Sequence, residues 1–210
     1  MTTGPRRVSI YALKGRFQDV LRPGVRRIAA LGITANQVTV FAVIVSVLVG
    51  GIVWAAAPDR PLVYLLLPGW MLLRMALNAV DGMLAREFGQ QSRLGVYLNE
   101  LSDVVADAAL YLSLLGVPGV NLHLVWAFVV LAALTEYAGV LGLMIGAGRR
   151  YDGPMGKSDR AFVVGVLGLL LAIEWIGAGV VEGVVLLASV LCVLTVVRRV
   201  RTGLRSSTPA

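Results

Sequence analysis

The chain has few residues of the kinds that build covalent cross-links or soft-metal sites: one cysteine and one histidine among 210 residues. A lone cysteine excludes a disulfide framework, and one cysteine with one histidine cannot form a zinc site of the Cys/His type. Cys192 stands in an apolar run, where we expect a small buried side chain. Charged residues are also scarce, at 15% of the chain, so long segments carry no charge.

Hydrophobic residues dominate instead. They make up 58% of the chain, and the mean hydropathy is +0.81, well above that of a soluble globular domain. We therefore expect an all-α, polytopic membrane protein with one helical bundle and no second sizeable domain. The N-terminus shows no short apolar core followed by a cleavage site, so we expect no signal peptide.

Six apolar segments are predicted to cross the bilayer. A basic segment over residues 9–31 precedes them and is predicted to form an amphipathic surface helix, interrupted at Pro23-Gly24. The predicted organisation is a basic amphipathic segment at 1–33, a six-helix transmembrane domain at 34–200 and a basic tail at 201–210. The six predicted spans cover residues 38–57, 62–84, 94–115, 122–145, 161–176 and 180–197, and the fifth is short unless its helix starts earlier.

Basic residues gather on one side of these spans. Of the 19, seven lie in the segment that ends at Arg27, four lie in 149–160 and four follow Val197. The loops on the opposite side carry only Arg60. The positive-inside rule then places both termini, and the polar segment described next, on the cytoplasmic side of the inner membrane. Because these charges flank apolar segments, they favour anionic lipid head groups over nucleic acid as partners.

The segment 78–107 is the most informative part of the chain. It reads NAVDGMLAREFGQQSRLGVYLNELSDVVAD and runs from the end of the second span into the third. Polar side chains are costly beside hydrocarbon, so their presence there marks a site. The segment combines glycines, which allow close approach of backbone or ligand, with six carboxylate or amide side chains: Asn78, Asp81, Asn99, Glu100, Asp103 and Asp107.

The spacing of these side chains places them on two facing helix surfaces. Asn78 and Asp81 are three residues apart, and Asn99, Asp103 and Asp107 recur at steps of four. Oxygen ligands of this kind suit Mg²⁺ or Mn²⁺, with substrate phosphates completing the shell. The alternative is an interhelical hydrogen-bond network that holds the bundle together. The amount of like charge favours a site with a cation.

The motif Asn78-x2-Asp81-Gly82-x2-Ala85-Arg86-x8-Gly95-x3-Asn99-x3-Asp103 resembles the signature of the CDP-alcohol phosphotransferases. That signature is Asp-x2-Asp-Gly-x2-Ala-Arg-x8-Gly-x3-Asp-x3-Asp. The segment 32–37, GITANQ, adds to the resemblance. The resemblance implies a six-helix membrane enzyme, commonly a homodimer, that displaces CMP from a CDP-linked lipid with an alcohol and uses one or two divalent metal ions.

The same resemblance implies roles for individual residues. Asp81 would bridge two metal ions, and Asp103 would bind metal and act as the general base, while Asn78 and Asn99 stand at the other two ligand positions. The positions that would hold the cytidine and pyrophosphate of the donor are Gly82, Ala85, Arg86, Ser92 and Gly95.

Two of the four signature aspartates are asparagines in this chain. Each replacement removes a charge and keeps an oxygen ligand, and Glu100 and Asp107 are candidate substitutes for the missing carboxylates. Because Asp103, Gly82 and Gly95 remain, we interpret the chain as a divergent active member. The alternatives are an inactive lipid- or nucleotide-binding protein on the same fold and an ion transporter. Clustering of the carboxylates at one end of the spans argues against the transporter.

The cytoplasmic loop at 148–160 carries four basic residues that are candidates for binding a phosphate on the acceptor: Arg149, Arg150, Lys157 and Arg160. Ordinary positive-inside charge is the competing explanation. Within the spans, Arg74 is predicted to form an ion pair, with Glu136 as its candidate partner. Gly139, Gly142 and Gly146 are predicted to serve helix packing or dimerisation.

The sequence therefore predicts transfer of a phosphatidyl group from a CDP-lipid, with CDP-diacylglycerol as the expected donor, to an alcohol. The acceptor stays open: glycerol 3-phosphate, inositol phosphate, serine or another alcohol all fit.

Overall fold

The computed structural model describes residues 10–206, and this part of the chain contains helices and no strand. The all-α prediction is confirmed for these residues, whereas the predicted terminal segments 1–33 and 201–210 extend beyond them. The elements are α1 (Ile10–Ala30), α2 (Ala35–Ala56), a 3-10 segment η1 (Pro61–Leu65), α3 (Leu66–Glu87), α4 (Arg93–Leu112), η2 (Ser113–Gly116), α5 (Leu122–Met144), α6 (Lys157–Ala172) and α7 (Ala178–Ser206).

Four helical segments in the described residues are long and apolar enough to cross a membrane: Ala35–Ala56, Pro61–Glu87, Leu122–Met144 and Ala178–Ser206. The helix α4 differs because it carries Glu100, Asp103 and Asp107 on 20 residues. The helix α6 has 16 residues, about 24 Å at 1.5 Å per residue, which is less than the roughly 30 Å of a hydrocarbon core. Six spans therefore remain a prediction.

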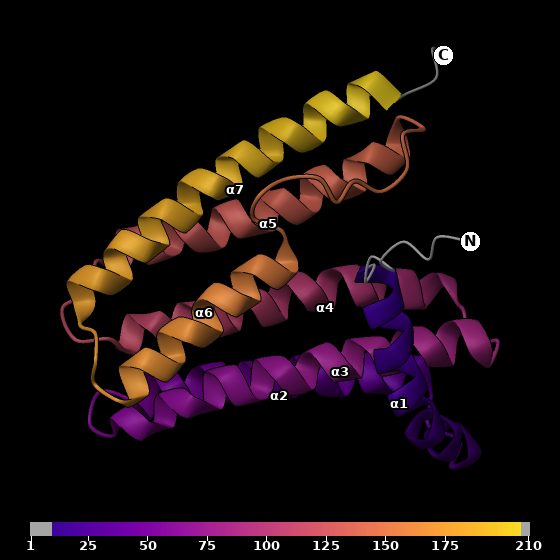
Figure 1. Cartoon of the computed structure of the whole chain (residues 1–210), viewed down its shortest axis with the longest axis horizontal. Coiled ribbons are helices and arrows are strands. Elements are labelled where there is room, and N and C mark those ends of the chain that lie inside the picture. Colours follow the sequence, from indigo (N-terminus) through magenta and orange to yellow (C-terminus); the bar gives the residue numbers. More distant parts are fainter. Residues whose placement is uncertain (1–9, 207–210) are drawn as a thin grey trace, which may run out of the picture.

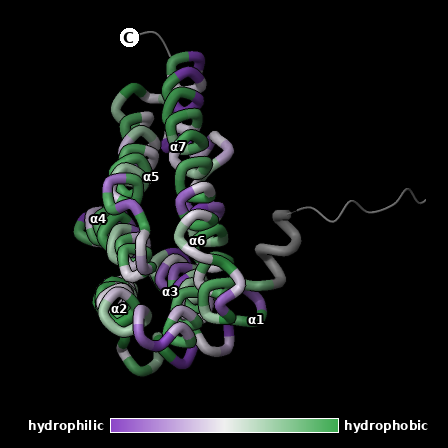
Figure 2. Tube along the Cα trace, turned by 90° about the vertical axis from the view of Figure 1, so that its left-hand side faces the viewer, coloured by the Kyte–Doolittle hydropathy of each residue, from purple (hydrophilic) through white to green (hydrophobic). Residues whose placement is uncertain are grey.

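The helices form two groups (Figure 1). In one group, α2 packs against both α3 and α4, and α6 packs against α3, while α5 and α7 pair with each other in the second group. The backbones of α3 and α4 approach each other at few points, so side chains fill the space between them. Figure 2 shows hydrophobic residues along most of α5 and α7 and hydrophilic residues gathered around α3.

Two glycines allow α2 to lie close to α4 and to the η2 segment that follows it. A Cβ on Gly50 would collide with the carbonyl oxygen of Ala109 in α4, and one on Gly116 would lie 2.9 Å from the carbonyl oxygen of Trp54. Small residues at such crossings let helix backbones approach. This packing fixes α2 and α4 relative to each other, and with them the polar side chains that both helices carry.

The helix α1 crosses the bundle near one end (Figure 1). It runs through Pro23, so the predicted interruption at Pro23-Gly24 was wrong; a proline removes one backbone donor, which a helix can accommodate by bending. Val25 is fully buried against a cluster that includes Val80 and Leu84, and Arg22 pairs with Glu87 at 3.2 Å. The location of α1 on a membrane surface remains a prediction.

Two other helix boundaries differ from the apolar runs. The helix α6 begins at Lys157, four residues before the predicted span, because the polar residues there form its first turn, with the Asp159 side chain accepting a hydrogen bond from the Gly156 N–H at 2.9 Å. The helix α7 extends to Ser206, beyond the apolar run that ends at Val197. The described part of the basic tail thus continues the last helix.

Candidate functional site between α3, α4 and α6

The residues of the motif lie on the last turns of α3, the connecting loop and the first turns of α4. Ser92 caps α4 by accepting a hydrogen bond from the Gly95 N–H at 2.9 Å. The side chain of Gln90 accepts a hydrogen bond from the Ala35 N–H at 2.7 Å, which ties the loop to the start of α2. These caps fix the register in which α3 and α4 face each other.

Asp81 lies on the inner side of α3 and is 6% exposed. The hydroxyl of Thr39 in α2 donates a hydrogen bond to its Oδ2 at 2.8 Å. No ion pair to Asp81 occurs among the side chains that the structure describes, residues 17–206. A buried carboxylate without a cationic partner is costly, so this side chain is suited to bind a cation.

Asp103 on α4 contacts two cationic side chains through the same oxygen. The ammonium of Lys157, the first residue of α6, forms an ion pair with Oδ1, and Nη2 of Arg74 lies 3.2 Å from it. Nη1 of Arg74 also pairs with Asp107 at 2.5 Å. The ion pair predicted for Arg74 is confirmed, but its predicted partner was wrong. Arg74 pairs with two carboxylates of α4, whereas Glu136 pairs with Arg149, Arg160 and Arg199.

The candidate hard-cation ligands of the motif are two carboxylates, Asp81 and Asp103, and two amides, Asn78 and Asn99. Among the described residues, no group of three or more Asp, Glu, His or Cys side chains is arranged so that it could hold a metal ion by itself. A divalent ion here would therefore depend on amide oxygens and substrate phosphates as well, and this donor set fits Mg²⁺ or Mn²⁺. Both asparagines are partly buried, and Asn78 lines a groove shared with Lys157.

The candidate donor-binding residues surround the N-terminal end of α4 and the C-terminal end of α3. Gly82 lies under the guanidinium of Arg86, and a Cβ at Gly82 would be 2.9 Å from Nη2. Gly95 similarly faces Asn36 Oδ1, at 2.9 Å from the position of a Cβ, and the Ser92 hydroxyl. Ala85, in contrast, packs against the apolar cluster under α1.

The two candidate substitute carboxylates are already paired with arginines. Glu100 forms an ion pair with Arg149. Asp107 is 4% exposed and binds Arg74 and, at 3.4 Å, Arg160. Neither side chain is therefore free to supply the charge that the two asparagines remove.

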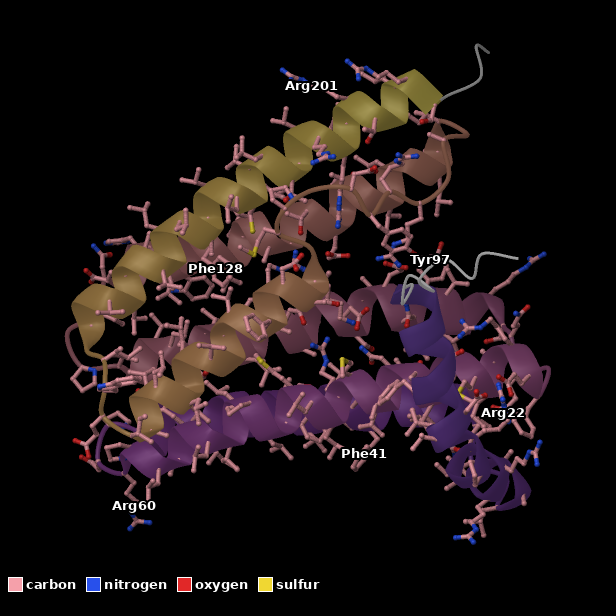
Figure 3. The ribbon with its side chains drawn as sticks, viewed as in Figure 1. Arg22, Phe41, Arg60, Tyr97, Phe128 and Arg201 are labelled. Atoms are coloured by element: carbon pink, nitrogen blue, oxygen red, sulfur yellow. The ribbon has the colours of Figure 1, made fainter. Side chains whose placement is uncertain are left out.

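Behind the motif, a buried ion network joins α4, α5, α6 and α7. Glu136 on α5 pairs with Arg160 at 2.9 Å, Arg149 at 3.1 Å and Arg199 at 3.7 Å. Arg160 is fully buried and also donates to the hydroxyl of Thr135 at 2.6 Å. Figure 3 shows nitrogen and oxygen atoms gathered in the space between α4, α5 and α6, away from Phe41 on the outer surface.

The loop between α5 and α6 lies against α5 and α7 (Figure 1). A Cβ on Gly139 would be 2.7 Å from the Arg150 carbonyl oxygen, and one on Gly142 would collide with the Gly148 carbonyl. These two glycines of the small-residue stripe therefore make room for a loop of the same chain, as a packing role predicts. The third, Gly146, adopts a positive φ of 70° in the turn after α5.

This loop carries the remaining candidate acceptor residues. The guanidinium of Arg149 lies 5.1 Å from the ring centroid of Tyr151, and Arg150 pairs with Asp152 at 2.8 Å. Burial alone would raise the pKa of the Asp152 carboxyl, but hydrogen bonds from Thr202 and Arg150 hold that pKa below its ordinary value. The loop is thus anchored by charge to α7 and presents Arg149 at the edge of the buried network.

Three polar side chains at the site were missed by the sequence analysis. Asn36 and Thr39 lie in the first turns of α2. The sequence analysis included Asn36 only in the segment 32–37 and did not single out Thr39, which contacts Asp81. Arg199 was counted as tail charge, yet it is 3% exposed and donates to the Asp152 carbonyl at 3.1 Å. Its position one turn past Thr195, at the start of the basic end of α7, is the signal that could have identified it.

A groove of about 540 Å³ runs between α3 and α6. At one end it is lined by Arg74, Asn78 and Lys157, which belong to or contact the motif site. From there it continues along apolar side chains such as Met71 and Phe162. A volume of this size is in the range of small-molecule pockets.

Comparison with known proteins agrees with this geometry. The family model of the CDP-alcohol phosphatidyltransferases matches residues 32–197. A curated relative, the inner membrane protein YnbA of Escherichia coli strain K12, is 45% identical over 170 residues, which are 80% of this chain and 84% of that protein.

Two solved structures share the fold. Both are of the phosphatidylinositol phosphate synthase PgsA1 of Mycobacterium tuberculosis, one with CDP-DAG bound and one in complex with manganese and citrate. They superpose with TM-scores of 0.72 and 0.71 at 20% identity, over 88% of this chain and 93% and 88% of theirs. The residues matched by the family model include the whole motif and the helices that carry its partners, α2 to α6, and on this basis the chain belongs to the CDP-alcohol phosphatidyltransferase family.

Proposed function

We propose that this protein transfers a phosphatidyl group from a CDP-lipid, CDP-diacylglycerol, to an alcohol and releases CMP. The observation that carries the proposal is the groove between α3 and α6, which joins an apolar channel to the polar residues of the motif. A lipid donor needs both parts, because its tails require apolar surface and its pyrophosphate requires cationic and hydrogen-bonding groups. The CDP-DAG bound to the related fold supports this choice of donor.

Within this proposal some residues of the motif bind the metal ion and others bind the donor. Asp81, Asp103, Asn78 and Asn99 would hold Mg²⁺ or Mn²⁺, which when bound supplies positive charge to the pyrophosphate. Gly82, Arg86, Ser92 and Gly95 would hold the cytidine and pyrophosphate, with Ala85 packed behind them.

Proton transfer falls to Asp103. Both of its cationic partners contact Oδ1, so we assign Oδ2 as the oxygen that accepts the proton of the acceptor hydroxyl. The hydroxyl oxygen then bonds to the phosphorus on the lipid side, the bond from that phosphorus to the bridging oxygen breaks, and CMP leaves with the bridging oxygen.

The acceptor side of the proposal lies in the loop after α5. Arg149, Arg150 and Lys157 are partly exposed at the site and are the groups proposed to bind a phosphate or other anionic part of the acceptor. Arg160 has no exposed surface, so its proposed part is to position Glu136 and Asp107. The name of the curated relative and the four apolar helices support a location in the inner membrane. The clustering of basic residues supports termini and a site that face the cytoplasm, and six crossings are part of the proposal.

Donor competition tests the lipid half of this proposal. Purified protein in mixed micelles is given Mg²⁺, a panel of alcohols and either CDP-diacylglycerol or CDP-glycerol, which carries no acyl tails. We expect CMP release from CDP-diacylglycerol and little from CDP-glycerol. Equal release from both would show that the groove between α3 and α6 does not bind the donor.

The two asparagines of the motif favour one alternative, a protein that binds CDP-lipid without turning it over. Binding of CDP-diacylglycerol without CMP release for any acceptor in the panel would support that alternative.

A further inference from the structure

We propose that the ammonium of Lys157 takes the place of one of the two divalent ions that a four-aspartate motif would hold, so that this protein binds a single divalent ion, at Asp81, and Oδ2 of Asp103 stays available as the base. This inference rests on the proposed function and concerns how the negative charge of the motif is balanced.

The first observation is the number of carboxylates. Asparagines stand at positions 78 and 99, so the four positions carry two negative charges. The neighbouring acids do not replace the missing charge, because Glu100 is paired with Arg149, and Asp107 is paired with Arg74 and Arg160. Asp103 is itself paired with Lys157 and Arg74, so the two carboxylates of the motif carry too little negative charge for two dications.

The second observation is the location of Lys157. It is the first residue of α6, and its ammonium forms an ion pair with Oδ1 of Asp103. It lines the same groove as Arg74 and Asn78, so a positive charge from α6 lies beside the position of one lost aspartate. The backbone at this helix start is capped by the Asp159 side chain, which accepts a hydrogen bond from the Gly156 N–H.

The third observation is the difference between the two carboxylates. Asp103 contacts Lys157 and Arg74, both through Oδ1. Among the described side chains, residues 17–206, Asp81 has one hydrogen-bond partner, the hydroxyl of Thr39. A divalent ion therefore meets a carboxylate without an ion-pair partner at Asp81, whereas a second ion close to Oδ1 of Asp103 would be repelled by the ammonium.

Counting of bound Mn²⁺ tests the inference independently of turnover. The full chain in detergent, saturated with CDP-diacylglycerol, is titrated with Mn²⁺, and free ion is measured by electron paramagnetic resonance. We expect one tightly held Mn²⁺ per chain in the parent. The double variant Asn78→Asp, Asn99→Asp should still hold one, because Lys157 remains.

The deciding variants add a change at Lys157 to that double variant. With Lys157→Met the number of bound ions should rise from one to two, and the pair of ions should give a spin-coupled spectrum. With Lys157→Arg, which keeps the charge and controls for the loss of lysine, the number should stay at one. Arg201→Gln removes one exposed positive charge from α7 (Figure 3) and should also leave it at one.

Each other outcome overturns the inference. Two Mn²⁺ ions in the parent, or in the double variant that retains Lys157, would show that the ammonium does not replace an ion. A single ion in the variant with Lys157→Met, with CDP-diacylglycerol still bound, would show that the ammonium was not what excluded the second. No bound Mn²⁺ in any variant would overturn the proposed function as well, and that result is distinct from the others.

Discussion

Replacement of Arg160 by methionine is expected to destabilise the protein strongly, although this residue resembled a ligand-binding side chain in the sequence. Arg160 is fully buried. Its guanidinium contacts two carboxylates, Glu136 at 2.9 Å and Asp107 at 3.4 Å, together with the Thr135 hydroxyl and the Met155 carbonyl at 3.2 Å. Methionine fills much of the same volume and removes all of these contacts.

The size of the expected loss of stability depends on the arginine partners that Glu136 and Asp107 retain. Removal of one partner from a buried ion pair costs about 3–5 kcal/mol when the other is left alone. Here Glu136 keeps Arg149 and Arg199, and Asp107 keeps Arg74 at 2.5 Å. We therefore expect a loss of about 2–4 kcal/mol, below the full value for an orphaned buried charge. For a chain of this size that corresponds to a fall in Tm of roughly 4–16 °C.

The assay is thermal unfolding in detergent, followed by intrinsic tryptophan fluorescence at fixed detergent and lipid concentrations. Arg201→Met is the matched control, because Arg201 is exposed and its replacement should change stability by less than about 0.5 kcal/mol. The double variant Arg160→Met, Glu136→Gln should recover part of the loss, because it removes a charge that has lost a partner. A fall in Tm no larger than that of the control would refute the structural role of Arg160. Arg160 would then again be a candidate for binding the acceptor.

Three further predictions concern the motif and the helix crossing. Asp103→Asn should abolish CMP release without a change in Tm beyond a few degrees, since the amide cannot accept the proton; turnover within a few-fold of the parent would remove Asp103 as the base. Gly82→Leu should displace the Arg86 guanidinium and weaken binding of CDP-diacylglycerol at least about tenfold, measured by equilibrium binding; unchanged affinity would show that the glycine serves packing. Gly50→Ala should lower the free energy of unfolding by about 1–3 kcal/mol, because the new Cβ meets a backbone carbonyl of α4. The control Gly51→Ala places its Cβ in open space and should leave stability unchanged. Equal Tm values for the two variants would contradict the close crossing.

The sequence was sufficient to predict the helices that carry the motif, because local patterns determine them. Asn78 and Asp81 on one helix, and Asn99 and Asp103 on the next, were predicted to face each other because polar side chains at helical spacing within apolar segments have one favourable orientation. The structure places the first pair on α3 and the second on α4, and their joint binding of a metal ion stays a prediction. The glycines of the motif were likewise a sign of close approach, and a Cβ at Gly82 or Gly95 would lie 2.9 Å from a neighbouring side-chain atom.

The partners of these side chains could not be predicted in the same way. The pairing of Arg74 with Asp103 and Asp107 depends on which helices are neighbours, and depth in the membrane alone favoured Glu136 as its partner. The start of α6 was placed too late because hydropathy does not detect a polar first turn, so Lys157 was assigned to a loop. The contact between Lys157 and Asp103 therefore emerges only from the three-dimensional arrangement.

The most direct test of the central claim is a mass balance of the transfer reaction. The protein is reconstituted in vesicles with CDP-diacylglycerol labelled in both the cytidine and the acyl chains, Mg²⁺ is supplied, and glycerol 3-phosphate, inositol phosphate, serine and other alcohols are added one at a time. The account predicts that at least one alcohol yields CMP and a new phospholipid in equal amounts, and that Asp103→Asn yields neither. Release of CMP with phosphatidic acid as the lipid product for every alcohol, or no release at all while CDP-diacylglycerol remains bound, would contradict it.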